Sequence, residues 1–326
     1  MIKTHIIKAL TRTVKVCYNL FVYWINIQAN YVERYFCLMA NEFVIITDSG
    51  SDITPSLAAE WGIKVVPLSY SIDDGEPLPG DKVDLKEFYA ALRAKSSSKT
   101  SAANLENFTQ AFGECAKQGK DVLYLGFSSG LSSTVSTGKL AASEMSEEYP
   151  DIKFYAVDTL CASLGQGMMV HIAVQMKNAG KTIEEIRDYV EENKLHLCHS
   201  FTVDDLFFLK RGGRVSATTA VVGSMLSIKP VLHVDNAGHL ISISKARGRK
   251  ASIQELAKAC IEKSIDPETQ TMFISHGDCE DEANELAAII KEKLNPVDVV
   301  VGCIGPVIGA HSGPGTIALF FLGNER

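Results

Sequence analysis

The sequence lacks several signatures that mark common protein classes. None of its eight cysteines is spaced C-x-x-C, which argues against a zinc ribbon or a thioredoxin-like redox motif. It contains no G-x-x-x-x-G-K-[ST] segment, so we expect no P-loop ATP site. Its 32 Lys and Arg residues form no block and face 39 Asp and Glu residues. We therefore do not expect nucleic acid as a partner.

An apolar run that could cross a membrane is also missing. Residues 14–27 come nearest, but Lys15, Asn19 and Asn26 interrupt a run that is already short, so we expect no stable membrane insertion. Residues 1–38 carry five basic side chains and one acidic one, which leaves 27 basic and 38 acidic groups in the rest of the chain. We interpret residues 1–40 as an N-terminal extension and expect translation to start at Met39. A basic amphipathic segment that touches lipid is the alternative.

What the 326 residues do contain is an ordinary globular composition, 46% hydrophobic and 22% charged. The length predicts two domains. The scattered cysteines are typical of a reducing compartment rather than of a disulfide framework, so we expect a cytoplasmic protein.

Strands and helices alternate from residue 41 to about residue 160. Apolar runs predict strands at 43–47, 63–70, 122–127 and 153–157, and Asp84 has the spacing of a helix cap. This alternation predicts an α/β N-terminal domain with a parallel sheet over 41–160. All of these strands except the second end in Ser, Thr or Asp, which suggests the rim of a site.

The pattern changes in residues 161–326. Capping-box spacings occur at Thr182 with Glu185 and at Ser252 with Glu255. Two of the expected strands are joined by residues 235–239 and predict a hairpin. We therefore expect a C-terminal α/β domain with a mixed or antiparallel sheet, and a cleft between the two domains. The strand-like runs are 201–203, 231–234, 240–244, 271–275, 297–304 and 316–321.

Gly126-Phe127-Ser128-Ser129-Gly130 satisfies the G-x-S-x-G pattern after a predicted strand. One interpretation is a serine hydrolase or esterase in which Ser128 attacks, His311 is the base and Asp278 is the acid. The alternative is a strand-to-helix turn whose hydroxyl and amide groups bind a ligand without reacting with it.

Three further segments contain candidate ligand groups. His196 and His199 flank Cys198, but neighbouring side chains of a strand point to opposite faces, so we predict no metal site. Residues 209–216 combine three cations with two glycines and predict either an anion site or a solvated loop. Residues 305–316 contain four glycines and two prolines around His311, which predicts that a ligand approaches this histidine closely.

These segments, in this order, resemble the DegV family, the bacterial fatty-acid-binding proteins that include the FakB subunit of fatty acid kinase. The resemblance runs from about Phe43 to the C-terminus, and it accounts for the G-x-S-x-G match without a hydrolase. The matching segments are Thr47-Asp48-Ser49, Val65-Val66-Pro67-Leu68, Lys99-Thr100-Ser101, Ser128-Ser129-Gly130-Leu131-Ser132, Asp204-Asp205-Leu206, Gly212-Gly213-Arg214-Val215-Ser216, Ile228-Lys229-Pro230-Val231-Leu232, Lys245-Ala246-Arg247-Gly248 and Ala310-His311-Ser312-Gly313-Pro314-Gly315.

The resemblance implies a two-domain protein that holds one long-chain fatty acid in a tunnel between the domains. It implies that Thr100 and Ser132 bind the carboxyl group and that His311 and Arg214 lie near this head-group. A cationic His311 would favour the carboxylate. We also expect Ser128 and Ser129 in the head-group vicinity.

In this family a separate ATP-dependent fatty acid kinase phosphorylates the bound acid, and the acyl phosphate feeds phospholipid synthesis. The resemblance therefore implies no catalytic residue, no metal and no cofactor beyond the fatty acid itself. Two departures from the family pattern flank the expected head-group. Ala102-Ala103 stands where the family usually has Gln-Pro, and Ser133-Thr134 stands where it usually has Gly-Thr.

Overall fold

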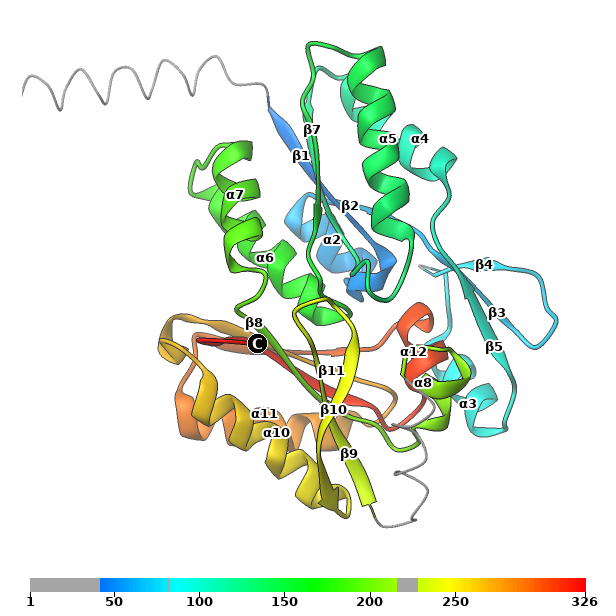
Figure 1. The fold of residues 1–326 in the computed structure, drawn as a ribbon, viewed down its shortest axis with the longest axis vertical. Helices are drawn as coiled ribbons and strands as arrows, with labels where there is room; N and C mark the ends of the chain where they lie inside the picture. Colours follow the sequence, from blue (N-terminus) through cyan, green and yellow to red (C-terminus); the bar gives the residue numbers. More distant parts are fainter. Residues whose placement is uncertain (1–41, 81, 216–227) are drawn as a thin grey trace, which may run out of the picture. The chain divides into compact units, whose positions relative to one another are not determined.

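A computed structural model describes residues 42–80, 82–215 and 228–326 (Figure 1). Contacts divide the chain into residues 1–42 and a compact unit over residues 43–326. The predicted extension at 1–40 and the predicted start at Met39 lie outside the described residues. The domain bounds 41–160 and 161–326 stay predictions.

The first half of the compact unit contains a parallel sheet with the strand order β2-β1-β6-β7. Its strands are Lys64–Val66, Phe43–Asp48, Asp121–Gly126 and Phe154–Asp158 in that order. Successive side chains of a strand point to opposite faces, and here both faces are covered. Val122 and Tyr124 pack against α4 (Leu105–Ala116) and α5 (Thr134–Glu148), whereas Leu123 and Leu125 face the opposite layer.

The helices of that opposite layer are α2 (Pro55–Trp61), α6 (Leu164–Asn178) and α7 (Ile183–Asn193). Burial on both faces explains why the predicted strands are continuous apolar runs. The capping box predicted at Thr182 and Glu185 begins α7 as expected.

The prediction of one continuous strand over residues 63–70 is wrong. The chain instead forms β2 and then β3 (Ser69–Ile72), which belongs to a separate sheet with the order β4-β3-β5. Pro67 lies between them and has no N–H to donate to a continuous ladder. The small sheet is completed by β4 (Leu78–Pro79) and β5 (Ser98–Ser101), and α3 (Leu85–Arg93) is capped by Asp84 as predicted.

The second half contains a six-stranded mixed sheet with the order β10-β9-β8-β13-β11-β12. Only β11 and β12 pair in parallel, and the predicted hairpin is present as β9 and β10. One face is closed by α10 (Arg249–Lys263) and α11 (Glu280–Leu294). The strands are β8 (Leu197–Thr202), β9 (Ile228–Val234), β10 (Leu240–Arg247), β11 (Thr271–His276), β12 (Asp298–Cys303) and β13 (Ile317–Leu322).

The predicted capping box at Ser252 and Glu255 is wrong. Helix α10 begins three residues earlier, after Gly248, and Ser252 lies inside it with its hydroxyl donated to the Arg249 carbonyl. Gly248 has φ +89, a conformation that glycine adopts at little cost, so the chain can turn directly from β10 into the helix.

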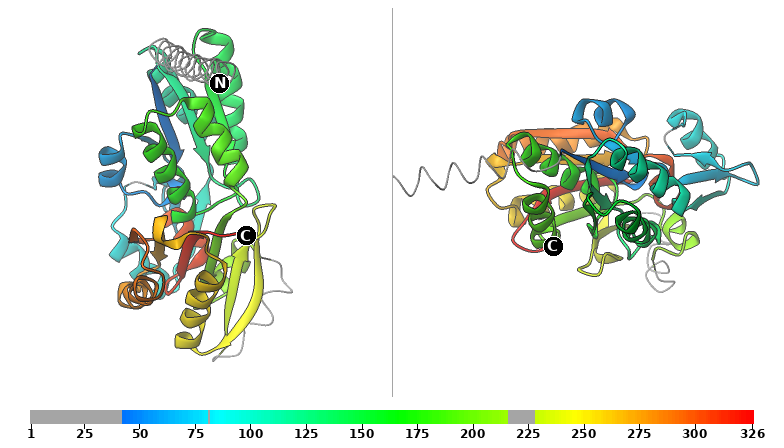
Figure 2. Two further views of the ribbon diagram at one scale, coloured as in Figure 1. Left: turned by 90° about the vertical axis from the view of Figure 1, so that its left-hand side faces the viewer. Right: turned by 90° about the horizontal axis from the view of Figure 1, so that it is seen from above.

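Helix α6 contributes to the cores of both halves. Val170, Ala173 and Val174 pack against the parallel sheet, while Leu164 and Met168 pack against the free face of the mixed sheet. Figure 2 shows the two sheets with this helix among the elements that join them. The fold thus has two α/β domains, a parallel-sheet N-terminal domain and a mixed-sheet C-terminal domain.

Candidate functional site

A cavity of about 200 Å³ lies on the face of the mixed sheet that α10 and α11 leave free. Ala318 and Phe320 of β13 line it, as does Thr316 just before the strand, because every second side chain along an extended chain faces the same side. Most of the wall is apolar. The apolar lining residues are Leu68, Ala102, Phe127, Leu131, Ala162, Phe201, Leu209, Val234, Leu240, Ile304, Val307, Ile308, Ala318 and Phe320.

Four of the predicted site residues line this same cavity: Thr100, Ser132, Arg214 and His311. Thr100 lies on β5, so it is positioned by the small sheet that was not predicted. His311 lies on the short helix α12 (Pro306–Ser312). The four come from parts of the chain up to 211 residues apart. Their predicted contacts with a carboxyl group stay predictions.

His311 is held by its Nε2, which lies 2.8 Å from Oγ1 of Thr100. Its Nδ1 is buried and has no hydrogen-bond partner among the described residues. A Cβ on Gly212 would overlap this Nδ1 atom, so a glycine is required for the loop after α8 (Phe207–Arg211) to pack against the ring.

The protonation state of His311 is set by burial and by two nearby cations. Burial, together with the positive charges of Arg214 and Arg211, lowers the pKa of His311 to about 4. The ring is therefore neutral and serves as a hydrogen-bonding group.

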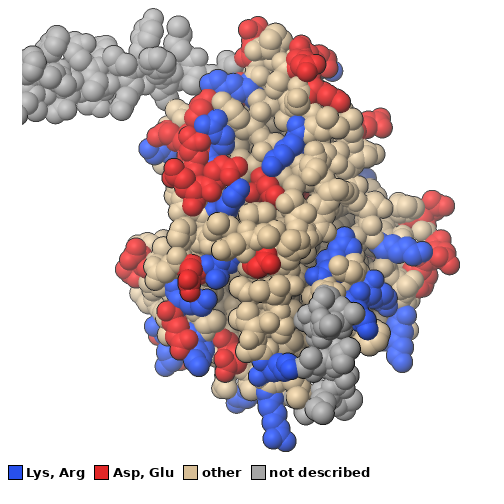
Figure 3. Space-filling model, in the orientation of Figure 1, with Lys and Arg blue, Asp and Glu red and all other residues tan. Residues whose placement is uncertain are grey.

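Arg214 supplies the fixed positive charge of the site. Its guanidinium donates hydrogen bonds to the carbonyl oxygens of Leu131 and Gly212, and among the described residues no carboxylate pairs with it. Burial lowers the pKa of Arg214, but an arginine stays protonated at neutral pH. Lys and Arg side chains also gather around α8 on the face shown in Figure 3, so the surroundings favour an anion.

Ser132 precedes α5 and lines the cavity next to Ser133. Its hydroxyl lies 2.8 Å from Oγ1 of Thr134 and accepts a hydrogen bond from the Thr134 amide at 3.2 Å. Arg214 holds the carbonyl of Leu131, the preceding residue, at 3.1 Å from Nη2. One guanidinium thus positions the turn that presents Ser132.

Ser128 and Ser129 are not part of the cavity wall. The Ser128 hydroxyl is fully buried and donates to the Gly238 carbonyl at 2.9 Å, which connects the turn to the tip of the β9–β10 hairpin. The Ser129 side chain is exposed, and its amide donates to Asp158. The Ser128 side chain is therefore used in an internal hydrogen bond, and the place of Ser128 and Ser129 in the head-group vicinity stays a prediction.

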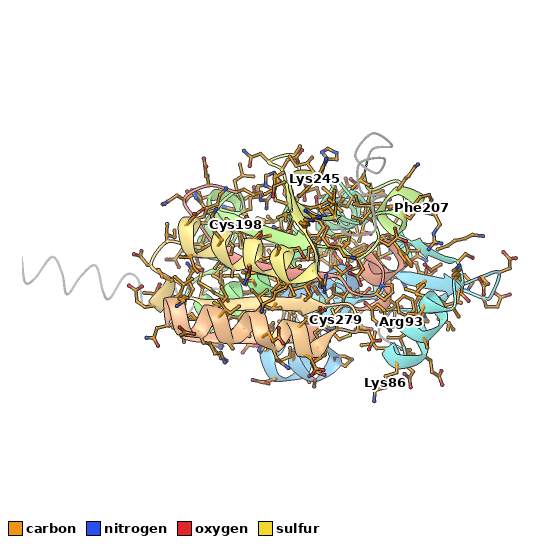
Figure 4. All side chains as sticks on the ribbon, turned by 90° about the horizontal axis from the view of Figure 1, so that it is seen from below. Lys86, Arg93, Cys198, Phe207, Lys245 and Cys279 are labelled. Atoms are coloured by element: carbon orange, nitrogen blue, oxygen red, sulfur yellow. The ribbon has the colours of Figure 1, made fainter. Side chains whose placement is uncertain are left out.

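The alternative hydrolase triad is not assembled. Ser128 is bonded to Gly238, and His311 has one ring nitrogen on Thr100 and the other without a partner, so His311 bonds neither Ser128 nor Asp278. Asp278 instead pairs with Arg93 on the surface, beside the turn that carries Cys279 (Figure 4). The hydrolase hypothesis has no geometric support.

The polar ends of the parallel strands do not form the rim of the cavity either. Asp48 is fully buried and accepts hydrogen bonds from the Tyr124 hydroxyl at 2.7 Å and from the amides of Phe127 and Gly50. Burial raises the pKa of Asp48, and these three donors act in the opposite direction. The carboxylate oxygens of Asp48 are therefore already hydrogen-bonded within the protein.

Sequence reasoning missed several polar residues of the cavity, namely His199, Ser163, Ser275, Ser312 and Thr316. Ser275 ends a predicted strand, and the rule that located polar strand ends in the N-terminal half would have found it in the C-terminal half. Ser163 has φ +55 at the start of α6, a conformation that no sequence pattern announces.

Metal-ligand clusters and membrane-spanning helices are two further features that would indicate a function. Within 42–80, 82–215 and 228–326, no group of three or more His, Cys, Asp and Glu side chains is arranged to hold a metal ion. The same part of the chain has no helix with the length and hydropathy of a membrane span.

Comparisons with known proteins agree with the fold and with the sequence motifs. The model of the DegV family, described as a family of uncharacterised proteins, matches residues 42–324. A DegV domain-containing protein of Clostridium perfringens is 46% identical over 87% of this chain and 99% of its own.

Two of the solved structures that are similar to this chain are described in terms of fatty acid binding. One from Thermotoga maritima, described as revealing a fatty acid binding function, is 31% identical over 87% of this chain and 99% of its own, with a TM-score of 0.75. A DegV family protein from Thermus thermophilus, described by its fatty acid binding, is 29% identical over 86% and 99%, with a TM-score of 0.79. The chain belongs to the DegV family.

Proposed function

We propose that this protein binds a long-chain fatty acid in the cavity and presents the carboxyl group to a separate ATP-dependent fatty acid kinase. The observation that carries the proposal is the grouping of Thr100, Ser132, Arg214 and His311 at one part of an otherwise mostly apolar wall. An apolar wall with a few convergent polar groups suits a ligand with a long tail and one charged end.

The expected energetics agree with a tail-driven binder. Burial of a methylene group contributes about 0.8 kcal/mol, so a chain of about fourteen methylenes offers on the order of 11 kcal/mol before the cost of association. Hydrogen bonds to a charged carboxylate add about 1.5–3 kcal/mol each. The tail would therefore supply most of the affinity, and the polar group would set the orientation.

The polar cluster suits a carboxylate in its hydrogen-bonding capacity. The Thr100 and Ser132 hydroxyls can donate, Arg214 is cationic and has no carboxylate partner among the described residues, and the neutral His311 has a free Nδ1. Thr100, Ser132 and Arg214 are half-buried rather than sealed, so a partner enzyme would have access to the carboxyl oxygen. The absence of a P-loop motif from the sequence fits a protein whose bound acid is modified elsewhere.

In this proposal the chain contributes no catalytic residue and needs no cofactor other than the fatty acid. The protein would act in the cytoplasm. Acyl-phosphate formation would belong to the partner kinase and would serve phospholipid synthesis.

The proposal is tested by extracting the protein purified from bacteria with organic solvent and identifying the lipid by mass spectrometry. We expect one saturated or unsaturated acid of the C14–C18 range per chain. The Thr100→Ala, Ser132→Ala double variant should retain less acid, or should yield less acyl phosphate with a fatty acid kinase and ATP. A folded wild-type protein that neither contains nor takes up fatty acid would refute the proposal.

A further inference from the structure

The β9–β10 hairpin supplies part of the cavity wall. Val234 and Leu240 are direct cross-strand partners at the end of the hairpin, and both line the cavity. Phe127 and Leu131, which belong to the turn after β6, line it as well. One wall is therefore shared by a turn that follows the parallel sheet and a hairpin that belongs to the mixed sheet.

In the described part of the chain, the outer part of this hairpin pairs only with itself. Strand β9 pairs with β8 through Val231 and Leu232, and β10 is the edge strand of the sheet. The register of β9 with β10 shifts between Ser242 and Ser244, opposite these same two residues. A bulge bends the strand that contains it, so residues 233–241 extend beyond a bending point. Residues 233–241 are called the hairpin flap below.

Two side chains from outside the hairpin hold the flap by its backbone carbonyls. The Ser128 hydroxyl donates to the Gly238 carbonyl at 2.9 Å. Arg326 donates from Nη1 to the Asp235 carbonyl at 3.0 Å and from Nε to the Leu197 carbonyl at 3.1 Å. The guanidinium thus connects β8 to β9 beyond the point where the two strands pair directly.

The flap meets the turn after β6 through two glycines. A Cβ on Gly130 would lie 2.6 Å from the carbonyl carbon of Gly238, and a Cβ on Gly238 would overlap Oγ of Ser128. Glycine is therefore required at both positions while this contact is kept. Gly238 is buried, whereas Ala237 and His239 on either side of it are exposed.

These restraints are few for a segment that closes a cavity. A neutral hydrogen bond changes an equilibrium by only about two- to tenfold, and segments with few buried contacts open more readily than the rest of a fold. A flap that moved away from the turn would separate Val234 and Leu240 from Phe127 and Leu131. The cavity wall would then open between the hairpin and the turn.

From these contacts we propose that the hairpin flap is the gate through which the fatty acid enters and leaves the cavity, and that the contact of Gly238 with Ser128 and Gly130 is its latch. This inference rests on the proposed function, because it assumes that the cavity holds a fatty acid.

A latch should control both exchange rates without changing the affinity. The latch is made in the empty and in the occupied protein alike, so a weaker latch lowers the barriers to entry and to exit by the same amount. Loss of a contact with the ligand itself would instead speed dissociation alone. Measurement of both rate constants therefore distinguishes a gate from a binding residue.

The experiment follows the uptake of cis-parinaric acid by the delipidated full-length protein in stopped flow, and its displacement by excess oleic acid. Gly130→Ala inserts a methyl group into the latch at a position that does not line the cavity and has no positive φ. We expect both rate constants to rise about tenfold, the effect of one lost hydrogen bond, with Kd within about twofold of the wild-type value. Ser128→Ala removes the bond without adding bulk and should also speed association.

Asn236→Ala is the matched control, because Asn236 is exposed on the same flap and is not a latch residue, so both rate constants should keep their wild-type values. Unchanged rate constants in Gly130→Ala and Ser128→Ala, with parinaric acid bound by both, would overturn the gate and leave the proposed function intact. Faster dissociation alone in Ser128→Ala would also contradict the gate and would assign this serine to the head-group. A wild type that binds no parinaric acid would refute the proposed function, and the gate with it.

Discussion

The buried polar residues of the parallel sheet and those of the cavity differ in how completely the protein satisfies them. Asp48 uses both carboxylate oxygens on protein donors: the Tyr124 hydroxyl and two backbone amides. In the cavity, Nδ1 of His311 and the Ser312 hydroxyl have no partner among the described residues, and Arg214 has only carbonyl acceptors. Both regions are rich in polar side chains, but only the second has capacity left for a ligand.

The comparison teaches that the number of buried polar groups at a strand end is a poor guide to a binding site. A satisfied network stabilises the fold, whereas unused donors and acceptors in a cavity cost free energy until something binds them. Substitutions in the two regions should therefore separate stability from binding.

The largest effect is expected for Asp48→Ala. The change leaves the Tyr124 hydroxyl and the Gly50 and Phe127 amides without their acceptor, at about 1–3 kcal/mol each, so unfolding in urea should show a loss of at least about 3 kcal/mol. Tyr124→Phe removes only one of these bonds and should cost less. Loss of fatty-acid affinity with unchanged stability would contradict the distinction between the two regions.

The Arg214→Ala substitution should reduce fatty-acid affinity more than stability. The variant loses a charge-assisted contact with the carboxylate, worth about 1.5–3 kcal/mol, and fatty-acid affinity measured by calorimetry should fall roughly tenfold to a hundredfold. Stability without ligand should fall less than in Asp48→Ala, because the variant loses hydrogen bonds to the carbonyls of Leu131 and Gly212 but leaves no buried carboxylate or ion pair broken. Arg211→Ala is the control on the adjacent α8, outside the cavity wall, and should change affinity by less than about threefold.

Gly212→Ala should affect binding through His311. The added Cβ overlaps Nδ1 of the ring, so the ring must move and its contact with Thr100 should lengthen. We expect a loss of affinity of about tenfold, the value of one hydrogen bond to a charged group at its lower limit. In a His311→Ala background the same glycine substitution should have little further effect, and additive losses would show that Gly212 acts by another route.

The smallest net effect in the wild type concerns pH, because two buried groups act in opposite directions. Burial raises the pKa of Asp52 to about 7, so between pH 4 and 7 the folded state holds a proton that the unfolded state has released. Stability therefore falls as pH rises through this range, by at most about 1.4 kcal/mol per pH unit. The lowered pKa of His311 acts in the opposite direction between about pH 4 and 6.5, because there the unfolded state binds the extra proton.

The two contributions oppose each other in the wild type, and Asp52→Asn should expose the second. In this variant stability should rise with pH between 4 and 6.5 more steeply than in the wild type, as measured by urea denaturation at several pH values. Parallel pH profiles for the two proteins would show that Asp52 does not hold its proton in the folded state.

Much of the fold could be predicted from local patterns. Apolar runs located most strands of both large sheets, and the Thr182 cap and the β9–β10 hairpin have short-range signals. The small sheet had none, because β4 contains two residues and β5 reads Ser-Lys-Thr-Ser, a polar sequence that becomes a strand only by pairing with β3.

The site could be predicted only in part, for a physical reason. The resemblance to the family singled out Thr100, Ser132, Arg214 and His311, and the structure brings them to one cavity. Ser163 and Ser275 look like ordinary helix-start and strand-end residues. Their orientation depends on a positive φ at Ser163 and on the register of β11 against β13, which are long-range properties of the folded chain.

The position of α6 has a consequence for the independence of the two halves. A fragment that ended before Leu164 would keep its four parallel strands but would lose Val170, Ala173 and Val174 from one face, and the complementary fragment would carry them as an exposed apolar stripe. Neither half is therefore a self-sufficient module. Chimaeras that exchange halves between relatives should fold only when this helix is chosen to match both of its partners.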